Sequence, residues 1–405
     1  MSENYDIAIV GGGMVGATLA CALEGSGLRI ALIESTEPVP FAPEQPHDLR
    51  VSAVSVASVS ILDAVGAWRG VAARRCCPFR RLRVWEDRGA VEFCSEDINE
   101  PVLGYIVENR ILQLALLDRL REVAEVSFLC PAKMRSIDYS AKGSSIELDG
   151  NRIIEARLLV AADGGQSQAR HAAGLGTSSW DYEQQALVMT VETAYGQQDV
   201  TWQRFTPDGP QAFLPLTGPH ASLVWYHSPD RVKWLRSLPE QVLLQELRQS
   251  FPACLGEIRR IVCRGVFALR RQHALRYCKD GVVLVGDAAH MIHPLAGQGV
   301  NIGLLDAAAL AEVLMKAARA GRDIGAAEVL REYESMRRTD NLVMMTTMDL
   351  FYRVFGNAHA PVRVLRNLGL GLAERIAPAK RLAMRYAMGL DGRVPKLARG
   401  QALGG

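Results

Sequence analysis

The stretch Tyr5–Glu34, which reads YDIAIVGGGMVGATLACALEGSGLRIALIE, decides the fold of this chain. A short apolar run leads into a glycine-rich turn, a segment of small residues follows, and a second apolar run ends at Glu34. Gly11, Gly13 and Gly16 fill the G-x-G-x-x-G spacing between a predicted strand and a predicted helix. In that pattern the first glycine permits a tight turn, the second lets the backbone approach a pyrophosphate, and the third lets helix and strand pack closely.

The start of the predicted helix, at Met14 and Val15, suits a phosphate group. Free N–H groups and the positive end of the helix dipole favour an anion there. Glu34 ends the second strand at the distance expected of a carboxylate that accepts a hydrogen bond from a ribose hydroxyl. Because strand, helix, second strand and terminal acid agree, residues 5–34 are predicted to bind a dinucleotide.

Composition describes a globular chain of 405 residues, 49% hydrophobic and 22% charged, which is long enough for two or three domains. The formal net charge of +2 argues against nucleic-acid binding. The eight cysteines form no C-x-x-C pair and no cluster at zinc spacing, so we expect reduced thiols and no metal site. The acidic N-terminus does not resemble a signal peptide, and no apolar run approaches the length of a membrane span. We therefore expect a cytoplasmic chain, soluble or peripheral to a membrane.

Charge is unevenly distributed along the chain. Residues 351–405 hold ten Lys or Arg against two acids. A split of this kind marks a membrane or partner contact in some proteins and an ordinary solvated helical face in others. Both interpretations stay open.

Four further residues before residue 180 are candidates for ligand contact. Arg50 precedes a predicted amphipathic helix that ends near Trp68, and it pairs with a cofactor phosphate or caps that helix at the surface. Gln113 lies one turn inside a predicted helix over 110–123, where it reaches a cofactor or points to solvent. Asp163 and Gly164 end a buried-type strand, and an acid placed there meets a ligand at the carboxyl edge of a parallel sheet.

Between residues 185 and 267 the hydrophobic pattern changes to period two, with turn residues between the apolar runs. This pattern predicts an antiparallel sheet, interrupted by a helix over 239–250 and inserted into the nucleotide-binding domain. A predicted hairpin over 76–96 adds to it. A separate sheet leaves room for a substrate where the two domains meet.

The nucleotide-binding domain then resumes with a strand that ends at Gly286 and Asp287 and with a helix lead-in after it. Small residues in that lead-in let backbone lie against a flat ring, and Asp287 is placed to hold a ribityl or ribose hydroxyl. His290 and His293, which flank the lead-in, either act as a base or hydrogen-bond loop backbone. The lead-in residues predicted to contact a cofactor are Pro294, Gly297, Gln298, Gly299, Val300 and Asn301.

Taken together, the three motifs resemble the flavoprotein monooxygenases related to para-hydroxybenzoate hydroxylase, and residues 286–303 resemble the UbiH/UbiF/COQ-type ubiquinone-biosynthesis hydroxylases. Within that branch the demethoxyubiquinol hydroxylases are the most similar group. The resemblance implies a mixed α/β fold and FAD, with its ADP part on the first motif and its ribityl end at Gly286–Asp287. It implies a Rossmann-like FAD-binding domain (1–72, 98–180, 270–330), an inserted antiparallel-sheet substrate domain (73–97, 181–269) and a helical C-terminal region (331–405).

The resemblance also implies the chemistry. NADH or NADPH reduces FAD, O₂ adds to give a flavin hydroperoxide, and the ring of a polyprenylated demethoxyubiquinol attacks the distal oxygen. His290, His293 and Pro294 are the catalytic candidates. Alternatives are a sister hydroxylase that acts at another ring position and a flavin-binding accessory subunit. Complex proteins of ubiquinone biosynthesis and the inner membrane are the implied partners.

Overall fold

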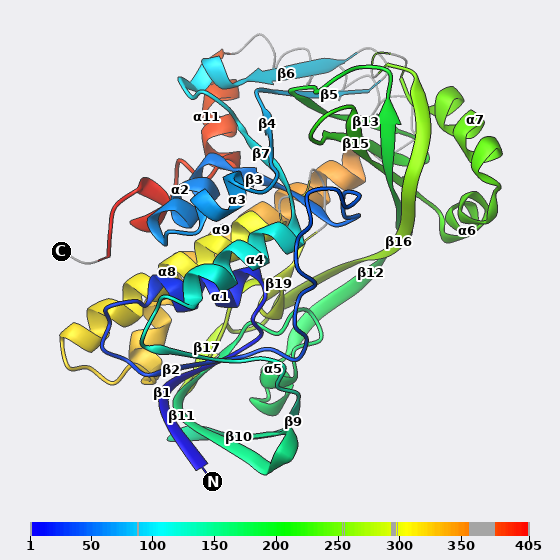
Figure 1. Cartoon of the computed structure of the whole chain (residues 1–405). Coiled ribbons are helices and arrows are strands. Elements are labelled where there is room, and N and C mark those ends of the chain that lie inside the picture. The colour runs from blue at the N-terminus through cyan, green and yellow to red at the C-terminus, as the bar shows by residue number, and fades with distance from the viewer. Residues whose placement is uncertain are drawn as a thin grey trace.

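The computed structural model describes residues 2–86, 89–252, 254, 256–292, 297, 299–355 and 377–403 (Figure 1). Two large sheets and one small sheet organise these residues. The helices outside the sheets are α1 (Met14–Ala22), α2 (Val56–Ala64), α3 (Trp68–Ala72), α4 (Asn109–Leu120), α5 (Gln168–Ala172), α6 (Pro229–Ser237), α7 (Glu240–Ser250), α8 (Gly299–Arg319), α9 (Ala327–Phe355) and α11 (Ala377–Ala387).

The first sheet carries the glycine-rich turn, and its strand order is β17-β18-β11-β1-β2-β8, with β10 paired to β11 and β9 paired to β10. The pairs of β11 with β18, β1 with β11, β1 with β2 and β2 with β8 are parallel. Their apolar runs are continuous because helices cover both faces of such a sheet. The bounds are β1 (Ser2–Val10), β2 (Ile30–Ile33), β8 (Val126–Leu129), β9 (Met134–Ser140), β10 (Gly143–Leu148), β11 (Arg152–Ala161), β17 (Cys278–Lys279) and β18 (Val282–Leu284).

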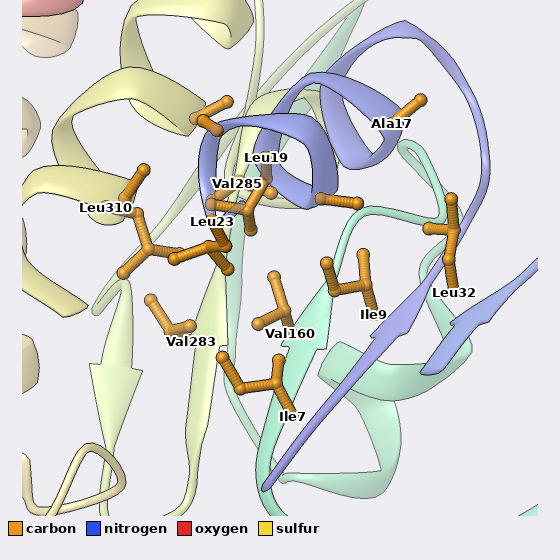
Figure 2. Close-up of a cluster of buried hydrophobic side chains, with 14 of the residues drawn as sticks. Ile7, Ile9, Ala17, Leu19, Leu23, Leu32, Val160, Val283, Val285 and Leu310 are labelled. Atoms are coloured by element: carbon orange, nitrogen blue, oxygen red, sulfur yellow. The ribbon is translucent and has the colours of Figure 1, made fainter. Parts of the chain in front are cut away.

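The core of this domain lies between the first sheet and two helices that begin at predicted motifs. Figure 2 shows Leu19 and Leu23 of the α1 segment gathered with Val160, Val283 and Leu310, which come from β11, β18 and α8. All five side chains are fully buried. Their packing fixes the starts of α1 and α8 above the carboxyl ends of the parallel strands.

The second sheet has the order β19-β16-β12-β15-β14-β13-β5-β6. Its pairs are antiparallel, as the period-two pattern predicted, except that β13 runs parallel to β5. Two of its strands, β12 and β16, are 17 residues long and reach back toward the first domain (Figure 1). The bounds are β5 (Arg81–Trp85), β6 (Ala90–Cys94), β12 (Thr177–Thr193), β13 (Val200–Thr206), β14 (Gly209–Pro215), β15 (His220–His227), β16 (Ile258–Ala274) and β19 (His290–Met291).

A small antiparallel sheet, β3-β7-β4, lies between the large ones and was not predicted. It consists of β3 (Val51–Ser55), β4 (Cys77–Phe79) and β7 (Gly104–Glu108). Its buried side chains share a cluster with Leu214 of the second sheet, with Leu216 just after β14, and with Met384 of α11. The small sheet therefore connects the second sheet with α11.

Several sequence predictions need correction or stay untested. The helix expected to end near Trp68 ends at Ala64 in α2, because the chain turns at Gly66, with φ of +79°, before α3 begins. The mixed α/β fold is confirmed. The domain boundaries stay predictions, and residues 356–376 of the expected helical C-terminal region lie outside the described residues. Among the described helices, none combines the length and the apolar character that a bilayer crossing requires.

Candidate active site

The glycine-rich turn has the geometry that its spacing predicted. Gly11 has φ of +107°, and a Cβ at this position would lie 2.3 Å from the carbonyl oxygen of Ala162. A Cβ at Gly16 would lie 2.0 Å from the carbonyl oxygen of Gly11. Gly13 differs, since it is the N-cap residue of α1 and a Cβ there would meet no atom within 4 Å. Gly11 and Gly16 thus serve packing, whereas Gly13 leaves open space at the helix N-terminus.

Two side chains hold the turn from opposite sides through Gly12. The Gly12 N–H donates to Oε2 of Glu34 at 2.9 Å, and Nε2 of Gln113 donates to the Gly12 carbonyl at 2.9 Å. The other oxygen of Glu34 accepts from the N–H of Thr36 at 3.0 Å. Gln113 therefore points to the glycine turn and not to solvent. Its contact with a cofactor stays a prediction.

Arg110 and Arg50 act near the same edge of the first sheet. Arg110 forms a two-point ion pair with Asp48, with 2.8 and 2.9 Å between nitrogen and oxygen, and it also donates to the carbonyls of Val39 and Pro40. These bonds fix the proline-rich loop. The Arg50 guanidinium is exposed and lies 5.2 Å from the ring centroid of Phe267 on β16. Arg50 thus lies where the two large sheets approach each other.

The middle motif, at Asp163 and Gly164, lies at the N-terminus of α5, whose N-cap residue is Ser167. Asp163 accepts from the Ser167 hydroxyl and, at 3.1 Å, from the N–H of Ala169. Arg170 is 2% exposed, and it donates to the carbonyls of Gly165 and Ala288 at 2.9 Å each. Burial lowers the pKa of this guanidinium. Arg170 ties the middle motif to the late one.

The late motif, at Gly286 and Asp287, packs directly on the first motif, the glycine-rich segment that includes Val15. Gly286 has φ of +57°, and a Cβ there would lie 3.1 Å from a methyl carbon of Val15. A Cβ at Gly303 would lie 2.6 Å from the same carbon. The Asp287 side chain remains accessible to solvent, yet surrounding protein atoms desolvate its carboxyl and raise its pKa, while His290 and Arg50 act in the opposite direction. The first and third motifs thus meet at Val15.

Asn301, near the start of α8, is 4% exposed and its amide is fully engaged with the segment β3–α2. Its Nδ2 donates to the Ala53 carbonyl at 2.8 Å, and its Oδ1 accepts from the Ser55 N–H and the Ser58 hydroxyl. Nearby, Gly297 has φ of +66°. Gly299 and Val300 are the first residues of α8. Pro294, Gln298 and His293 lie outside the described residues.

His290 belongs to a buried network around Asp306. Nε2 of His290 hydrogen-bonds to Oδ2 of Asp306 at 2.5 Å, and the two residues are 2% and 0% exposed. The other carboxylate oxygen accepts from Nε of Arg337 at 2.9 Å and from Nδ2 of Asn341 at 3.0 Å. Burial raises the pKa of Asp306, but these partners outweigh it and lower the pKa to about 2. The Gly286 N–H donates to the same carboxylate at 3.2 Å, so the network also holds the turn that bears Asp287.

Comparison with known proteins places this geometry in a family. A family model described as an FAD binding domain matches residues 4–346. The chain is 45% identical over 390 residues to the 3-demethoxyubiquinol 3-hydroxylase of Escherichia coli, covering 96% of this chain and 100% of that one. It is 41% identical to the ubiquinone hydroxylase UbiL of Rhodospirillum rubrum (98% and 93% covered) and 32% identical to the COQ6 monooxygenase of Danio rerio (95% and 90%). The chain belongs to this family of FAD-dependent ubiquinone-biosynthesis hydroxylases.

The fold agrees with that membership. The p-nitrophenol 4-monooxygenase PnpA of Pseudomonas putida superposes with a TM-score of 0.78 at 19% identity, over 96% of this chain and 99% of that one. PqsL of Pseudomonas aeruginosa, titled a probable FAD-dependent monooxygenase, gives 0.77 at 21% identity, over 91% and 99%. The para-hydroxybenzoate-hydroxylase-like architecture expected from the motifs is confirmed. The chain is an FAD-dependent monooxygenase.

The residues present fit FAD. The space beside Gly13, at the unobstructed N-terminus of α1, admits a pyrophosphate that a side chain there would displace. Glu34 retains acceptor capacity for a ribose hydroxyl, since a carboxylate has about four lone-pair sites. Asp287 presents an accessible carboxylate for a hydroxyl further along the cofactor.

Sequence reasoning missed Asp306, which holds His290, and Arg337, which pairs with Asp306. A signal was available in α8, where Asp306 is the single acid within the otherwise apolar run Ile302–Ala311. A lone acid in such a run is buried only when it is paired. The identity of its partners could not be read from sequence, because they come from other elements.

Proposed function

We propose that this chain inserts one oxygen atom into the ring of a polyprenylated demethoxyubiquinol, with FAD as cofactor and with NAD(P)H and O₂ as co-substrates. The observation that carries the proposal is the 45% identity to the Escherichia coli 3-demethoxyubiquinol 3-hydroxylase over the whole length of that relative. All three cofactor motifs of the chain converge on one side of the parallel sheet, which supports it. A sister reaction at another ring carbon is the alternative, since UbiL of Rhodospirillum rubrum is 41% identical.

Bound FAD supplies the electron exchange with NAD(P)H and O₂. The chain's own residues bind the cofactor, orient it and shield it from water. The α1 N-terminus at Gly13 would hold the pyrophosphate, Glu34 the ribose, and Asp287 the ribityl end. The Asp306 carboxylate fixes the turn before Asp287 through the Gly286 N–H and fixes the His290 imidazole through Nε2. Asp306 thus orients both the turn and His290, and the action of His290 as a base stays a prediction.

Exclusion of water falls to the second sheet. Ala186, Val188, Tyr226 and Leu269 form a buried apolar cluster there. Partly buried Leu49, Tyr182, Val224 and Phe267 pack against it. Because Leu49 neighbours Arg50 and Phe267 contacts it, this cluster borders the cofactor domain. A reaction that consumes O₂ and a reducing cofactor needs such a wall to prevent wasteful release of hydrogen peroxide.

We also propose that α11 contacts a membrane surface that supplies the prenylated substrate. Lys380 pairs with Asp97 at 3.4 Å and Arg385 with Asp391 at 2.9 Å, so these two charges serve the fold. Arg381 is exposed, and its neighbour Leu382 is 64% exposed, which favours an interfacial contact of a cation and an apolar side chain. Flotation with phosphatidylglycerol vesicles tests this. The double change Arg381→Glu and Leu382→Ser should reduce the bound fraction, whereas Arg236→Glu on α6 should not. Equal binding by all three proteins would contradict the contact.

The activity itself is tested by NAD(P)H oxidation. A short-tailed demethoxyquinol should accelerate oxidation by the FAD-loaded protein, and the oxidised equivalents should match the hydroxylated product. An accessory subunit would bind FAD without that acceleration.

A further inference from the structure

The two faces of the second sheet differ in how they are covered. One face packs against α6 and α7, and its side chains Leu187, Met189, Phe213 and Leu223 are 0% exposed. The opposite face, here called the inner face, bears Leu214, whose cluster includes the small sheet and α11. Figure 1 shows α6 and α7 beyond β16, on the side away from α9. The inner face is therefore the one turned toward the cofactor domain.

A row of side chains crosses the middle of the inner face. The strand register places Gln203 opposite Ala212, Ala212 opposite Val224, Val224 opposite Val188, and Val188 opposite Gly265. Val224 and Gly265 are partly exposed, although both lie within the sheet. Leu49 covers the Gly265 end of the row, since a Cβ there would lie 2.9 Å from a methyl carbon of Leu49. A flat ring would therefore lie over the small side chain of Ala212 and the partly exposed Val224.

Polar atoms without partners border the row. Nε2 of Gln203, Oγ of Ser222 and Oγ1 of Thr190 are buried, and no atom within the part of the chain that the structure describes forms a hydrogen bond with them. The three residues are 5%, 0% and 0% exposed. Ser222 and Thr190 lie directly opposite each other on β15 and β12. Buried polar atoms without partners are rare in folded proteins because each one lowers stability.

We propose that Gln203, Ser222 and Thr190 are specificity-determining residues that hydrogen-bond to the oxygen substituents of a quinol ring lying on the inner face. The proposal rests on the proposed function, since that function supplies a ring with hydroxyl and methoxy oxygens. Sheet spacings put the Cα atoms of Gln203 and Ser222 roughly 12 Å apart, so that their side chains approach a single ring from two edges. The Gln203 amide donates to a methoxy or hydroxyl oxygen, and the two hydroxyl side chains donate or accept. A ring without oxygen substituents leaves all three unpaired.

The test uses Gln203→Met, which keeps the volume and removes the amide, with Gln211→Met as its matched control. Gln211 lies on the helix-covered face, opposite Arg204 and Trp225, is 3% exposed, and has its own unpartnered Oε1. Ser222→Ala and Thr190→Val extend the series. The measurements are KM and kcat for the quinol in the FAD-loaded enzyme and the melting temperature of each protein without quinol.

For Gln203→Met we expect KM to rise about three- to tenfold, because the variant loses one neutral hydrogen bond to the quinol. Its melting temperature without quinol should be unchanged or raised. Ser222→Ala and Thr190→Val should behave alike. Gln211→Met should keep the wild-type KM. An unchanged KM in Gln203→Met and Ser222→Ala, or a KM raised equally by Gln211→Met, would overturn the proposal. Failure of the proposed function can be distinguished from failure of this inference. If the proposed function were wrong, the wild-type enzyme itself would form no oxygenated quinol.

Discussion

Oε2 of Glu34 lies 2.9 Å from the backbone nitrogen of Gly12 and accepts its hydrogen, although 22 positions separate the two residues. The end of the second strand is thereby joined to the turn that receives the pyrophosphate. Replacement of Glu34 by Ala removes a charged acceptor from both Gly12 and the ribose. We expect FAD affinity to fall about 10- to 100-fold, as for a charge-assisted hydrogen bond. Flavin fluorescence titration measures this, with Glu34→Gln expected between wild type and Glu34→Ala. Equal dissociation constants for all three proteins would contradict the assignment.

The glycines of the turn should separate cofactor binding from folding. A Cβ at Gly13 meets open space, so Gly13→Ala should leave the FAD-free protein as stable as wild type while FAD content falls. A Cβ at Gly16 would lie 2.0 Å from a backbone oxygen, so Gly16→Ala should destabilise the FAD-free protein by about 1–3 kcal/mol. Melting curves and the flavin-to-protein absorbance ratio report the two effects. The account fails if both variants lose stability equally.

The buried network around Asp306 should be sensitive to loss of one partner. Arg337→Met removes the cation whose Nε lies 2.9 Å from the carboxylate and leaves a buried charge less compensated. We expect destabilisation of about 3–5 kcal/mol in denaturant titrations. Arg322→Met, which breaks a solvent-accessible ion pair with Glu332, is the control and should have a much smaller effect. A similar small effect for Arg337→Met would show that the network contributes little.

His47 gives a pH dependence of stability. Burial, with contributions from Arg75 and His220, lowers the pKa of His47 to about 3. Unfolded histidine titrates near pH 6.5, so the unfolded chain binds more protons between pH 6.5 and about 3, and stability falls as pH drops through that window. His47→Gln should reduce this slope by about 1.4 kcal/mol per pH unit. Chemical denaturation at pH 6.5, 5.5 and 4.5 measures it, with exposed His171→Gln as control. An identical slope in His47→Gln would contradict the burial effect.

The cofactor motifs could be predicted because their signals are local. The positions of Gly11, Gly13, Gly16 and Glu34 follow from a strand–turn–helix–strand pattern within 30 residues, and the structure places Glu34 on that turn. The helix α6 was missed, although Ser228-Pro229-Asp230 carries a helix-start signal with proline in the first turn. The period-two runs predicted the strands of the second sheet but not its parallel β13–β5 pair.

Contacts between distant elements could not be predicted. Asp306 joins His290, 16 positions earlier, to Arg337, 31 positions later, and only the folded helices bring them together. Gln203 of β13 and Gln211 of β14 both lie in strands whose apolar residues alternate, yet the two side chains lie on opposite faces of the sheet. Which face meets the ring depends on where α6 and α7 pack, and period two alone does not encode that.

The most direct test of the central claim combines the purified protein, FAD, NAD(P)H, O₂ and a short-tailed demethoxyquinol. Mass spectrometry detects a product heavier by one oxygen, and NMR locates that oxygen. We predict a hydroxyl group at the free ring carbon beside the methyl-bearing carbon. The assignment would be contradicted if the FAD-loaded protein formed only hydrogen peroxide, or if the product carried the new oxygen at a different ring carbon.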